Sequence, residues 1–262
     1  MSNETIIYEK KDGVAKITLN RPQVLNAMND VMFREIGEAL EDSEEDNTIR
    51  VVVITGKGRA FCTGVDLKFS REKLTSQKAK EDFYRYGNRV KMRRIVEMSK
   101  PVIAAVNGFA LAGGFEIMLA CDLAIASEDA QLGDQHMIYG FFGAGGSPFR
   151  LPLLVGMRKA KELIFTGKMI SGKEAERIGL VNRAVPADQL ESAVDELVAQ
   201  LVDKSPVAMK ISKAYINRTA YIDADSRLEL LIMSALALDG SEDSQEGMKA
   251  FAEKRKPVYK GR

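Results

Sequence analysis

The apolar and polar positions of this chain alternate between short runs typical of strands and longer stretches typical of helices. Residues 14–19 (VAKITL) alternate in character and precede an Asn-Arg-Pro loop signal, which predicts a strand that ends in a loop. Residues 27–45 place apolar side chains at helical spacing among acids, which predicts an amphipathic helix. Continuous apolar runs predict strands covered on both faces, at 51–55 (VVVIT), 102–106 (VIAAV) and 123–127 (LAIAS).

Helical composition appears between these strands, at 72–98 and 115–121. The alternation of strand and helix in this part of the chain predicts a layered α/β domain with some parallel pairing. After Pro186 the pattern is almost wholly helical, and each predicted helix opens on Asp or Ser or follows one: 188–203, 205–218, 224–238 and 241–254. The apolar stripes of these helices need a partner, either the domain body or a neighbouring subunit, so we expect an oligomer.

Composition narrows the class of protein. Of the 262 residues, 45% are hydrophobic and 29% are charged, a balance typical of globular proteins. Lys and Arg number 38 against 37 for Asp and Glu, so no net charge argues for nucleic acid or a membrane as partner. Cys62 and Cys121 each lie in an apolar run, which predicts buried thiols in a reducing compartment. The polar start resembles no targeting signal and no apolar run is long enough to span a membrane, so we expect a cytoplasmic protein.

Two glycine-containing segments each follow a predicted buried strand and precede a helical stretch: RAFCTGVDLK at 59–68 and NGFALAGGFE at 107–116. Glycine permits backbone angles and close approaches that leave amide N–H groups free to point into a pocket. Two amides from different turns can hold one oxygen, which is the arrangement of an oxyanion hole for an enolate or a tetrahedral intermediate. The alternative is that both are plain strand-to-helix turns without a ligand. Neither segment matches a phosphate-binding signature.

A set of motifs runs in a fixed order along nearly the entire chain. The motifs are ITLNRP at 17–22, LNAM at 25–28, VVVITGKGRAFCTGVDLK at 51–68, KPVIAAVNGFALAGGFEIMLACDLAIAS at 100–127, GAGGSPFRLPLLVG at 143–156, TGKMISGKEAERIGLVNRAVP at 166–186 and EGMKAFAEKRKP at 246–257. Together they resemble the enoyl-CoA hydratase/isomerase (crotonase) family. The resemblance implies an α/β fold of the crotonase type, in which residues 1–186 form a spiral core of ββα units with the acyl-CoA site. It implies that residues 187–262 form a helical region used for trimerisation.

The same resemblance implies the partners of the protein. An acyl-CoA thioester is the expected substrate, and no cofactor or metal is expected because coenzyme A enters as part of that substrate. Neither nucleic acid nor a membrane is an expected partner. The expected assembly is a homotrimer or a dimer of trimers.

Site residues follow from the resemblance position by position. The two oxyanion amides fall on Val65 and Gly113. The edge of the pocket that holds the adenine and phosphates of coenzyme A falls on Lys68 and on the backbone around Ala60 and Cys62.

Two C-terminal residues complete the expected coenzyme A contacts. Phe251 and Lys254 match positions that reach toward a coenzyme A bound by a neighbouring subunit. For Lys254, as for Lys68, a solvated charge is the alternative interpretation. The Gly-rich segment at 143–150 is expected to form a turn that shapes the wall around the acyl group.

The resemblance also points to the acid–base groups. Family hydratases place two glutamates across the α,β double bond, and this chain keeps the first as Glu116. Without the resemblance, a Glu in the first turn of a helix is explained by the helix dipole. His136, the only histidine, occupies the second position. Imidazole exchanges protons near neutral pH, so His136 is the candidate second group, although a lone histidine is also typical of a packed, hydrogen-bonded residue. Asp134 and Tyr139 are lesser candidates for proton transfer.

These residues favour a hydro-lyase that adds water across the double bond of an enoyl-CoA. The Val65 and Gly113 amides would polarise the thioester carbonyl, Glu116 would handle the water that adds to C3, and His136 would protonate C2. An isomerase that shifts a double bond is the first alternative, since one acid–base residue suffices for it. Thioester hydrolysis, decarboxylation and hydration of an alicyclic dienoyl-CoA are further alternatives in the family. A CoA-ester-binding protein without turnover is the alternative from another class.

Overall fold

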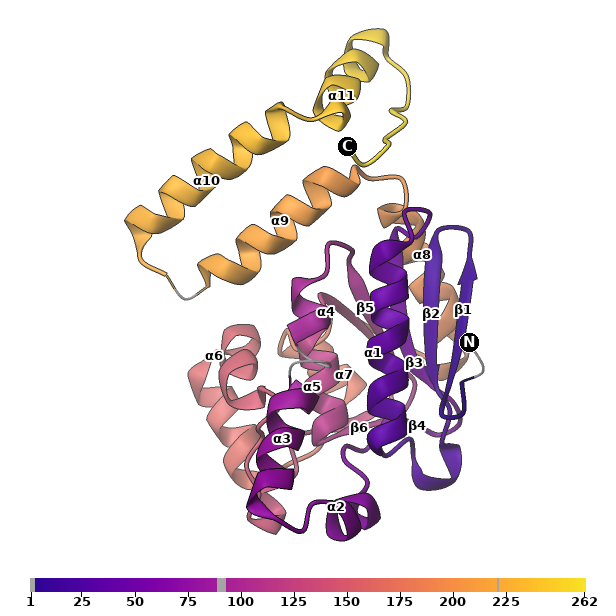
Figure 1. The fold of residues 1–262 in the computed structure, drawn as a ribbon, viewed down its shortest axis with the longest axis vertical. Coiled ribbons are helices and arrows are strands. Elements are labelled where there is room, and N and C mark those ends of the chain that lie inside the picture. Colours follow the sequence, from indigo (N-terminus) through magenta and orange to yellow (C-terminus); the bar gives the residue numbers. More distant parts are fainter. Residues whose placement is uncertain (1–2, 89–92, 221) are drawn as a thin grey trace.

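Two β-sheets packed with helices form the body of the protein, and a pair of long helices extends from it (Figure 1). The computed structural model describes residues 3–88, 93–220 and 222–262. The first sheet has the order β1 (Ile6–Lys11), β2 (Val14–Leu19), β3 (Val51–Gly56), β5 (Val102–Val106), β7 (Leu123–Ser127), β10 (Arg183–Val185). Apart from the antiparallel hairpin of β1 and β2, its neighbouring strands are parallel. The predicted layered α/β architecture with parallel pairing is therefore confirmed.

A second, smaller sheet carries the glycine-rich turns. Its order is β4 (Ala60–Cys62), β6 (Phe109–Leu111), β8 (Gln131–Gly133), β9 (Ile170–Ser171). The first three strands are parallel and β9 is antiparallel to β8. These strands were not predicted from the sequence, because runs of two or three residues are too short to show the alternation of apolar and polar side chains.

The continuous apolar runs become central strands because both faces of the first sheet are covered. In β3, Val52 and Ile54 face the large core cluster, whereas Val51 and Val53 face a second cluster that includes Leu190 of α8. These strand residues are all buried. Successive side chains of a strand point to opposite faces, so a strand between two apolar layers needs apolar residues at every position.

Helices fill the space between and beyond the strands. The helices of the described residues are α1 (Asp30–Glu45), α2 (Leu67–Lys73), α3 (Gln77–Asn88), α4 (Arg94–Glu97), α5 (Gly113–Ala120), α6 (Ser147–Thr166), α7 (Gly172–Arg177), α8 (Leu190–Leu201), α9 (Pro206–Thr219), α10 (Ala224–Asp239) and α11 (Glu242–Glu253). The predicted helical stretch 72–98 contains the end of α2, then α3 and α4, and its residues 89–92 lie outside the described residues. The helices predicted after Pro186 are confirmed within a few residues.

Local signals explain where the C-terminal helices begin. Ser205, Asp223 and Ser241 each accept a hydrogen bond from a backbone N–H of the first turn, of α9, α10 and α11 respectively. The helix predicted from residue 188 begins at Leu190 as α8, because a 3₁₀ turn precedes it and Gln189 at its N-cap makes no side-chain capping bond.

The helix α6 is the main element that the sequence analysis did not predict. The segment 143–150 was expected to be a turn throughout, but its last residues, from Ser147, already form the first turn of this helix. Gly156 interrupts α6 with a φ of 77°, and Pro152 lies inside it. Both residues break the apolar periodicity by which a helix is recognised in a sequence.

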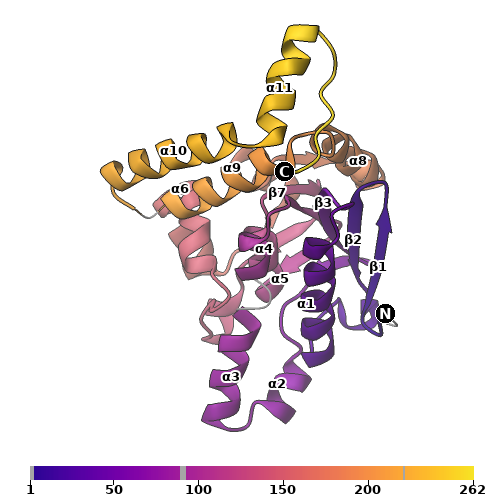
Figure 2. The same cartoon turned by 45° about the horizontal axis from the view of Figure 1, so that its top comes forward.

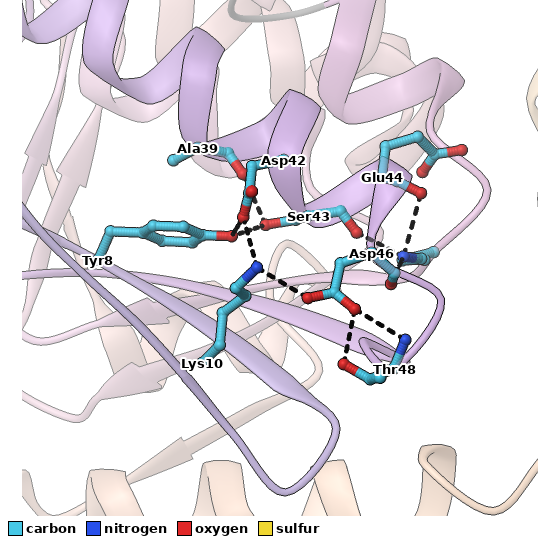
Figure 3. A network of polar contacts seen from close by, with 9 residues as sticks. Tyr8, Lys10, Ala39, Asp42, Ser43, Glu44, Asp46 and Thr48 are labelled. Atoms are coloured by element: carbon cyan, nitrogen blue, oxygen red, sulfur yellow. Dashed lines mark hydrogen bonds and ion pairs between the residues drawn. The ribbon is translucent and has the colours of Figure 1, made fainter. Parts of the chain in front are cut away.

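The β1–β2 hairpin is tied to α1 by a polar network at the edge of the sheet (Figure 3). The Tyr8 hydroxyl donates to Asp42 Oδ2 at 2.7 Å, and Lys10 Nζ lies 2.8 Å from Asp42 Oδ2 and 2.7 Å from Asp46 Oδ2. Burial and the hydrogen bond with Asp42 raise the pKa of Tyr8 to about 12. The phenol therefore stays a donor at any physiological pH, and the network is structural.

An ion pair between a buried lysine and a partly exposed aspartate connects the C-terminal helices to the body. Lys213 of α9 donates to Asp122 Oδ2 at 2.7 Å and to the carbonyl oxygens of Ile95 and Lys100 at 2.8 and 2.9 Å. Asp122 follows α5 and also accepts from the Val102 N–H at 2.7 Å. All three protons of the ammonium are thereby used, as a buried cation requires.

Replacing Lys213 with Met is expected to lower the free energy of unfolding by about 1–3 kcal/mol, because the Asp122 carboxylate and two carbonyl oxygens lose the donor that they share. Urea unfolding followed by circular dichroism measures this difference. Lys210→Met on the exposed face of the same helix is the matched control, with an expected change within about 0.5 kcal/mol. Equal stabilities of the two variants would contradict this role of Lys213.

Candidate functional site

The first glycine-rich turn places the Val65 amide. Val65 forms a parallel bridge with Met28, in which the Met28 N–H donates to the Gly64 carbonyl and the Asp66 N–H donates to the Met28 carbonyl. Amides of successive residues in an extended segment point to opposite sides, so the Val65 N–H points away from Met28. Arg21 holds the end of this turn through an ion pair of 3.0 Å with Asp66, the residue that also caps α2.

The second turn places the Gly113 amide at the start of α5. Gly113 is the first residue of the helix, and a first-turn N–H has no carbonyl partner within its own helix. The preceding Ala112 has a φ of 48° and a ψ of −120°, an uncommon conformation for a residue with a side chain. Such strained angles cluster at functional sites, where the surrounding structure holds them in place.

The two turns touch each other. A Cβ atom on Gly64, which has a φ of 100°, would lie 2.9 Å from the Gly113 nitrogen and 3.1 Å from the Ala112 Cβ. Glycine is therefore required at position 64 both by its backbone angle and by the close approach. In the part of the chain that the structure describes, the hydrogen bonds include none donated by the Val65 or Gly113 amide. The geometry is compatible with two amides that hold one oxygen.

Glu116 lies one helical turn after Gly113 and is 4% exposed. Its Oε1 accepts from the Ser147 N–H at 3.2 Å and lies 3.4 Å from the Ser147 hydroxyl. The loop before α6 covers the carboxylate so closely that a Cβ on Gly145 would lie 2.3 Å from Glu116 Oε2. A buried carboxylate next to two open amides is suited to exchange protons with a bound molecule.

Asp134 and His136 lie on the other side of Ser147. The Ser147 hydroxyl donates to Asp134 Oδ2, and Asp134 is 1% exposed. His136 Nδ1 lies 3.1 Å from Asp134 Oδ1, a distance typical of an ion pair, although the direction of the contact is poor for a hydrogen bond. The contact between Asp134 and His136 is therefore mainly electrostatic. The structure thus brings Glu116, Asp134 and His136 together around one serine.

The charges of this cluster shift the pKa values of its members. Burial lowers the pKa of His136, but the contact with Asp134 and the negative charge of Glu116 outweigh it and raise the pKa overall. Burial raises the pKa of Asp134, but the contacts with His136 and Ser147 outweigh it and lower the pKa overall. The ion pair therefore stabilises the fold between the two unfolded-state pKa values. Stabilisation by His136 is lost as the pH rises through its folded pKa, and stabilisation by Asp134 is lost as the pH falls through its folded pKa.

The other candidate residues are placed as follows. Tyr139 is 71% exposed and its ring lies beside that of Phe141, so its hydroxyl is not part of the buried cluster. Ala60 and Cys62 are buried in β4, and the Ala60 carbonyl accepts from Asn26 Nδ2 at 2.7 Å. Lys68 is exposed in the first turn of α2, near the turn that holds Val65.

The two C-terminal candidates lie far from this cluster within one chain. Phe251, which is 88% exposed, is on α11, and Lys254 follows that helix with a φ of 54°. Figures 1 and 2 both place α11 at the end of the molecule opposite to α2, which begins just before Lys68. Phe251 and Lys254 therefore do not reach the site of their own chain.

An apolar cavity of about 230 Å³ opens beside the cluster. Two charged residues, Asp134 and Lys161, line it, and the rest of the lining comes from the 137–143 segment and α6, including Phe141, Phe142 and Met157. The cavity has the size and lining of a compartment for a short hydrocarbon group.

The described residues contain neither a candidate metal site nor a candidate membrane span. Across residues 3–88, 93–220 and 222–262, no group of three or more His, Cys, Asp or Glu side chains is arranged to hold a metal ion. In the same ranges, no helix combines the length and the apolar character needed to cross a bilayer.

A pair of touching amide turns beside a buried carboxylate defines an enzyme class that stabilises negative charge on a bound carbonyl oxygen. Similarity to known proteins supports the same class of enzyme. The family model for enoyl-CoA hydratase/isomerase matches residues 9–262, and the chain belongs to this family.

Individual relatives cover the whole length of the chain. A short-chain-enoyl-CoA hydratase from Clostridium acetobutylicum is 40% identical over 257 residues, which cover 98% of this chain and 97% of that protein. A crotonyl-CoA hydratase from Syntrophomonas wolfei is 38% identical over 260 residues, 99% of each chain. The crystal structure of an enoyl-CoA hydratase from Bacillus anthracis matches with a TM-score of 0.93 at 35% identity, covering 99% of this chain and 100% of that one. The expected crotonase-type fold and an enzyme of this family are thereby confirmed.

Sequence reasoning missed Ser147, which joins the two halves of the cluster. A Ser-Pro pair directly after a glycine run is a signal for a helix start, and it would have placed Ser147 at the beginning of α6. It would not have revealed that this helix start faces Glu116 and Asp134, because they are 31 and 13 residues away in the sequence.

Proposed function

We propose that this enzyme adds water across the α,β double bond of a short-chain enoyl-CoA thioester. The observation that carries the proposal is the buried carboxylate of Glu116 one helical turn from the Gly113 amide, in a chain of this family. The names of the relatives, a short-chain-enoyl-CoA hydratase and a crotonyl-CoA hydratase, point to the same reaction and to short acyl groups.

The thioester carbonyl oxygen binds between the Val65 and Gly113 amides and gains negative charge as the reaction proceeds. Glu116 takes a proton from water while the water oxygen forms a bond to C3, and the π electrons move through C2 to the carbonyl oxygen. His136 in its protonated form then supplies a proton to C2 as the carbonyl re-forms. The proton held by Glu116 then returns through solvent to His136, so both groups regain their starting forms and one water is consumed for each double bond. Each positioned donor lowers the barrier by roughly 2.7–4 kcal/mol.

Coenzyme A binding follows the same assignment. The backbone around Ala60 and Cys62 and the side chain of Lys68 border the adenine and phosphates, because they lie on the strand and helix that flank the Val65 turn. No separate cofactor and no metal takes part, since the thioester itself carries the group that must be polarised.

The acyl group occupies the cavity beside Asp134. Its volume of about 230 Å³ and its apolar lining suit a chain of a few carbons. We place the protein in the cytoplasm, a reducing compartment in which thiols such as those of Cys62 and Cys121 stay reduced.

The enzyme acts as a trimer or a dimer of trimers. Apolar side chains of α10 stand exposed in the single chain: Leu228, Leu231, Ile232, Met233 and Leu236. A second copy of the chain is the partner that would cover them, and it would also bring Phe251 and Lys254 toward a neighbouring coenzyme A site.

Sedimentation velocity is expected to give a mass of three or six chains, and Leu231→Glu together with Leu236→Glu is expected to shift it to monomer. The same change at the exposed Lys11, on the distant hairpin, is not expected to alter the mass. A wild-type monomer at micromolar concentration would contradict the assembly.

Crotonyl-CoA tests the reaction directly. The purified enzyme is expected to remove the absorbance of the conjugated enoyl thioester and to form 3-hydroxybutyryl-CoA, identified by mass spectrometry. Absence of this change with enoyl chains of several lengths would end the hydratase proposal.

An isomerase is the second candidate function, because the position of the second family glutamate is occupied by His136 and one acid–base group suffices to move a double bond. A 3-enoyl-CoA would then gain the absorbance that a hydratase removes. Formation of conjugated product from the 3-enoyl substrate, without hydration of crotonyl-CoA, would favour this reaction.

A further inference from the structure

Two buried polar residues, Asp134 and Ser147, lie between the two proposed proton-transfer groups, and the proposed mechanism uses none of their contacts. Asp134 is the one that connects to both sides. Its Oδ1 lies 3.1 Å from His136 Nδ1, and its Oδ2 accepts the Ser147 hydroxyl. Ser147 in turn donates its backbone N–H to Glu116 Oε1 at 3.2 Å.

We propose that Asp134 is the positioning residue of this site: it holds His136 in the protonated form as the donor to C2, and through Ser147 it fixes the carboxylate of Glu116. The inference rests on the proposed hydration and assigns a role to a residue that itself transfers no proton to substrate.

A buried imidazole becomes neutral unless a negative charge is close, because burial disfavours its charged form. Asp134 is 1% exposed, so the charge that it presents to His136 is poorly screened by water. Glu116 adds a second, more distant negative charge. Among the positive groups of α6, which packs against the His136 segment, Arg150 donates to the Gly145 carbonyl at 2.9 Å and Lys161 lines the adjoining cavity.

A serine hydroxyl has one proton to donate, and here Ser147 directs it to Asp134. That bond fixes the rotation of the Ser147 side chain and the position of the first turn of α6. The Ser147 N–H is then aimed at Glu116 Oε1, which leaves Oε2 as the oxygen not held by Ser147. Asp134 thereby acts on the two proton-transfer groups through separate contacts.

The test uses the single histidine of the chain, whose imidazole gives an unambiguous nuclear magnetic resonance signal. In the wild-type enzyme without substrate, His136 is expected to titrate above the value of about 6.5 that is ordinary for histidine. Asp134→Asn is expected to move the titration below the wild-type value, because the burial cost remains and the attraction is lost. Ser147→Ala is expected to leave the charge of Asp134, and so the imidazole titration, nearly unchanged.

Measurements of turnover distinguish the contact of Asp134 with His136 from its contact with Ser147. Both variants are expected to lose about tenfold to a hundredfold in kcat, a part of the roughly 10²–10⁴ that acid–base catalysis contributes, with little change in KM. The alkaline limb of the pH–rate profile is expected to move to lower pH in Asp134→Asn but not in Ser147→Ala. Asp129→Asn, an exposed aspartate in the preceding turn, is the matched control and is expected to behave as wild type in both measurements.

A wild-type His136 that titrates at or below the ordinary value would overturn the proposal without any variant, so a failure of Asp134→Asn to fold does not protect it. An unchanged titration in a folded Asp134→Asn would overturn it as well. The magnetic resonance measurements need no substrate. If crotonyl-CoA is not hydrated but the titrations behave as expected, hydration fails while the control of His136 by Asp134 stands.

Discussion

Glu116→Gln is expected to reduce kcat for hydration of crotonyl-CoA by about 10²–10⁴ and to leave the fold intact, because it removes the group that takes the proton from water. Gln has the shape of Glu and its amide oxygen still accepts the Ser147 N–H, so the packing around position 116 is preserved. Stopped-flow absorbance measures the rate, and circular dichroism with thermal unfolding verifies the fold.

The control for this variant is a second buried glutamate. Glu35 accepts from the backbone N–H groups of Glu4 and Thr5 at 2.7 and 2.8 Å, and it belongs to α1 and not to the helix that carries Glu116. Glu35→Gln is expected to lower stability with kcat within about twofold of wild type, because the change weakens a charge-assisted hydrogen bond but touches no proposed reacting group. Equal kcat values for the two variants would remove Glu116 from the mechanism.

Gly64→Ala is expected to lower kcat/KM by about 10²–10³, the loss typical of one displaced oxyanion donor. The added Cβ would lie 2.9 Å from the Gly113 nitrogen, so the two turns must separate, and the Val65 and Gly113 amides can no longer hold one oxygen. The positive φ of 100° adds strain of about 1–3 kcal/mol, which thermal unfolding would detect.

Gly13→Ala separates the effect of strain from the effect of collision. Gly13 has a φ of 81°, and its nearest neighbours would lie 3.6 Å from an added Cβ, in the turn between β1 and β2. This variant is expected to lose a similar stability while kcat/KM stays within about twofold, since it carries the same type of strain away from the site. If both variants kept full activity, the Val65 and Gly113 amides would not form the proposed oxyanion hole.

The fold was predictable to the extent that each element carried its own periodic signal. The runs 51–55, 102–106 and 123–127 are apolar at nearly every position because two cores cover the sheet, and each became a strand with bounds within a residue of the prediction. The strands of the second sheet and the helix α6 were missed, since short length or internal Gly and Pro erased the period. Motif resemblance supplied the fold type, which local pattern alone did not give.

The site was predictable residue by residue only where a motif named the position. Val65, Gly113, Glu116 and His136 came from the resemblance, and the structure brings their segments together. The roles of these residues stay predictions until the variants are measured. Ser147 could not be found from sequence, because its contacts join segments that meet only after folding, and the exposure of Tyr139 likewise depends on the path of one loop.

Every residue of the helix α5, which carries the proposed base Glu116, is buried. A laboratory search for activity on bulkier acyl groups is therefore expected to find few tolerated changes in this helix, since each one repacks the interior. Productive diversity is expected instead at 137–142 and along the cavity side of α6, where the side chains border open volume. Tolerance to substitution is thus expected to be low in α5 and higher in the 137–142 segment and along the cavity side of α6.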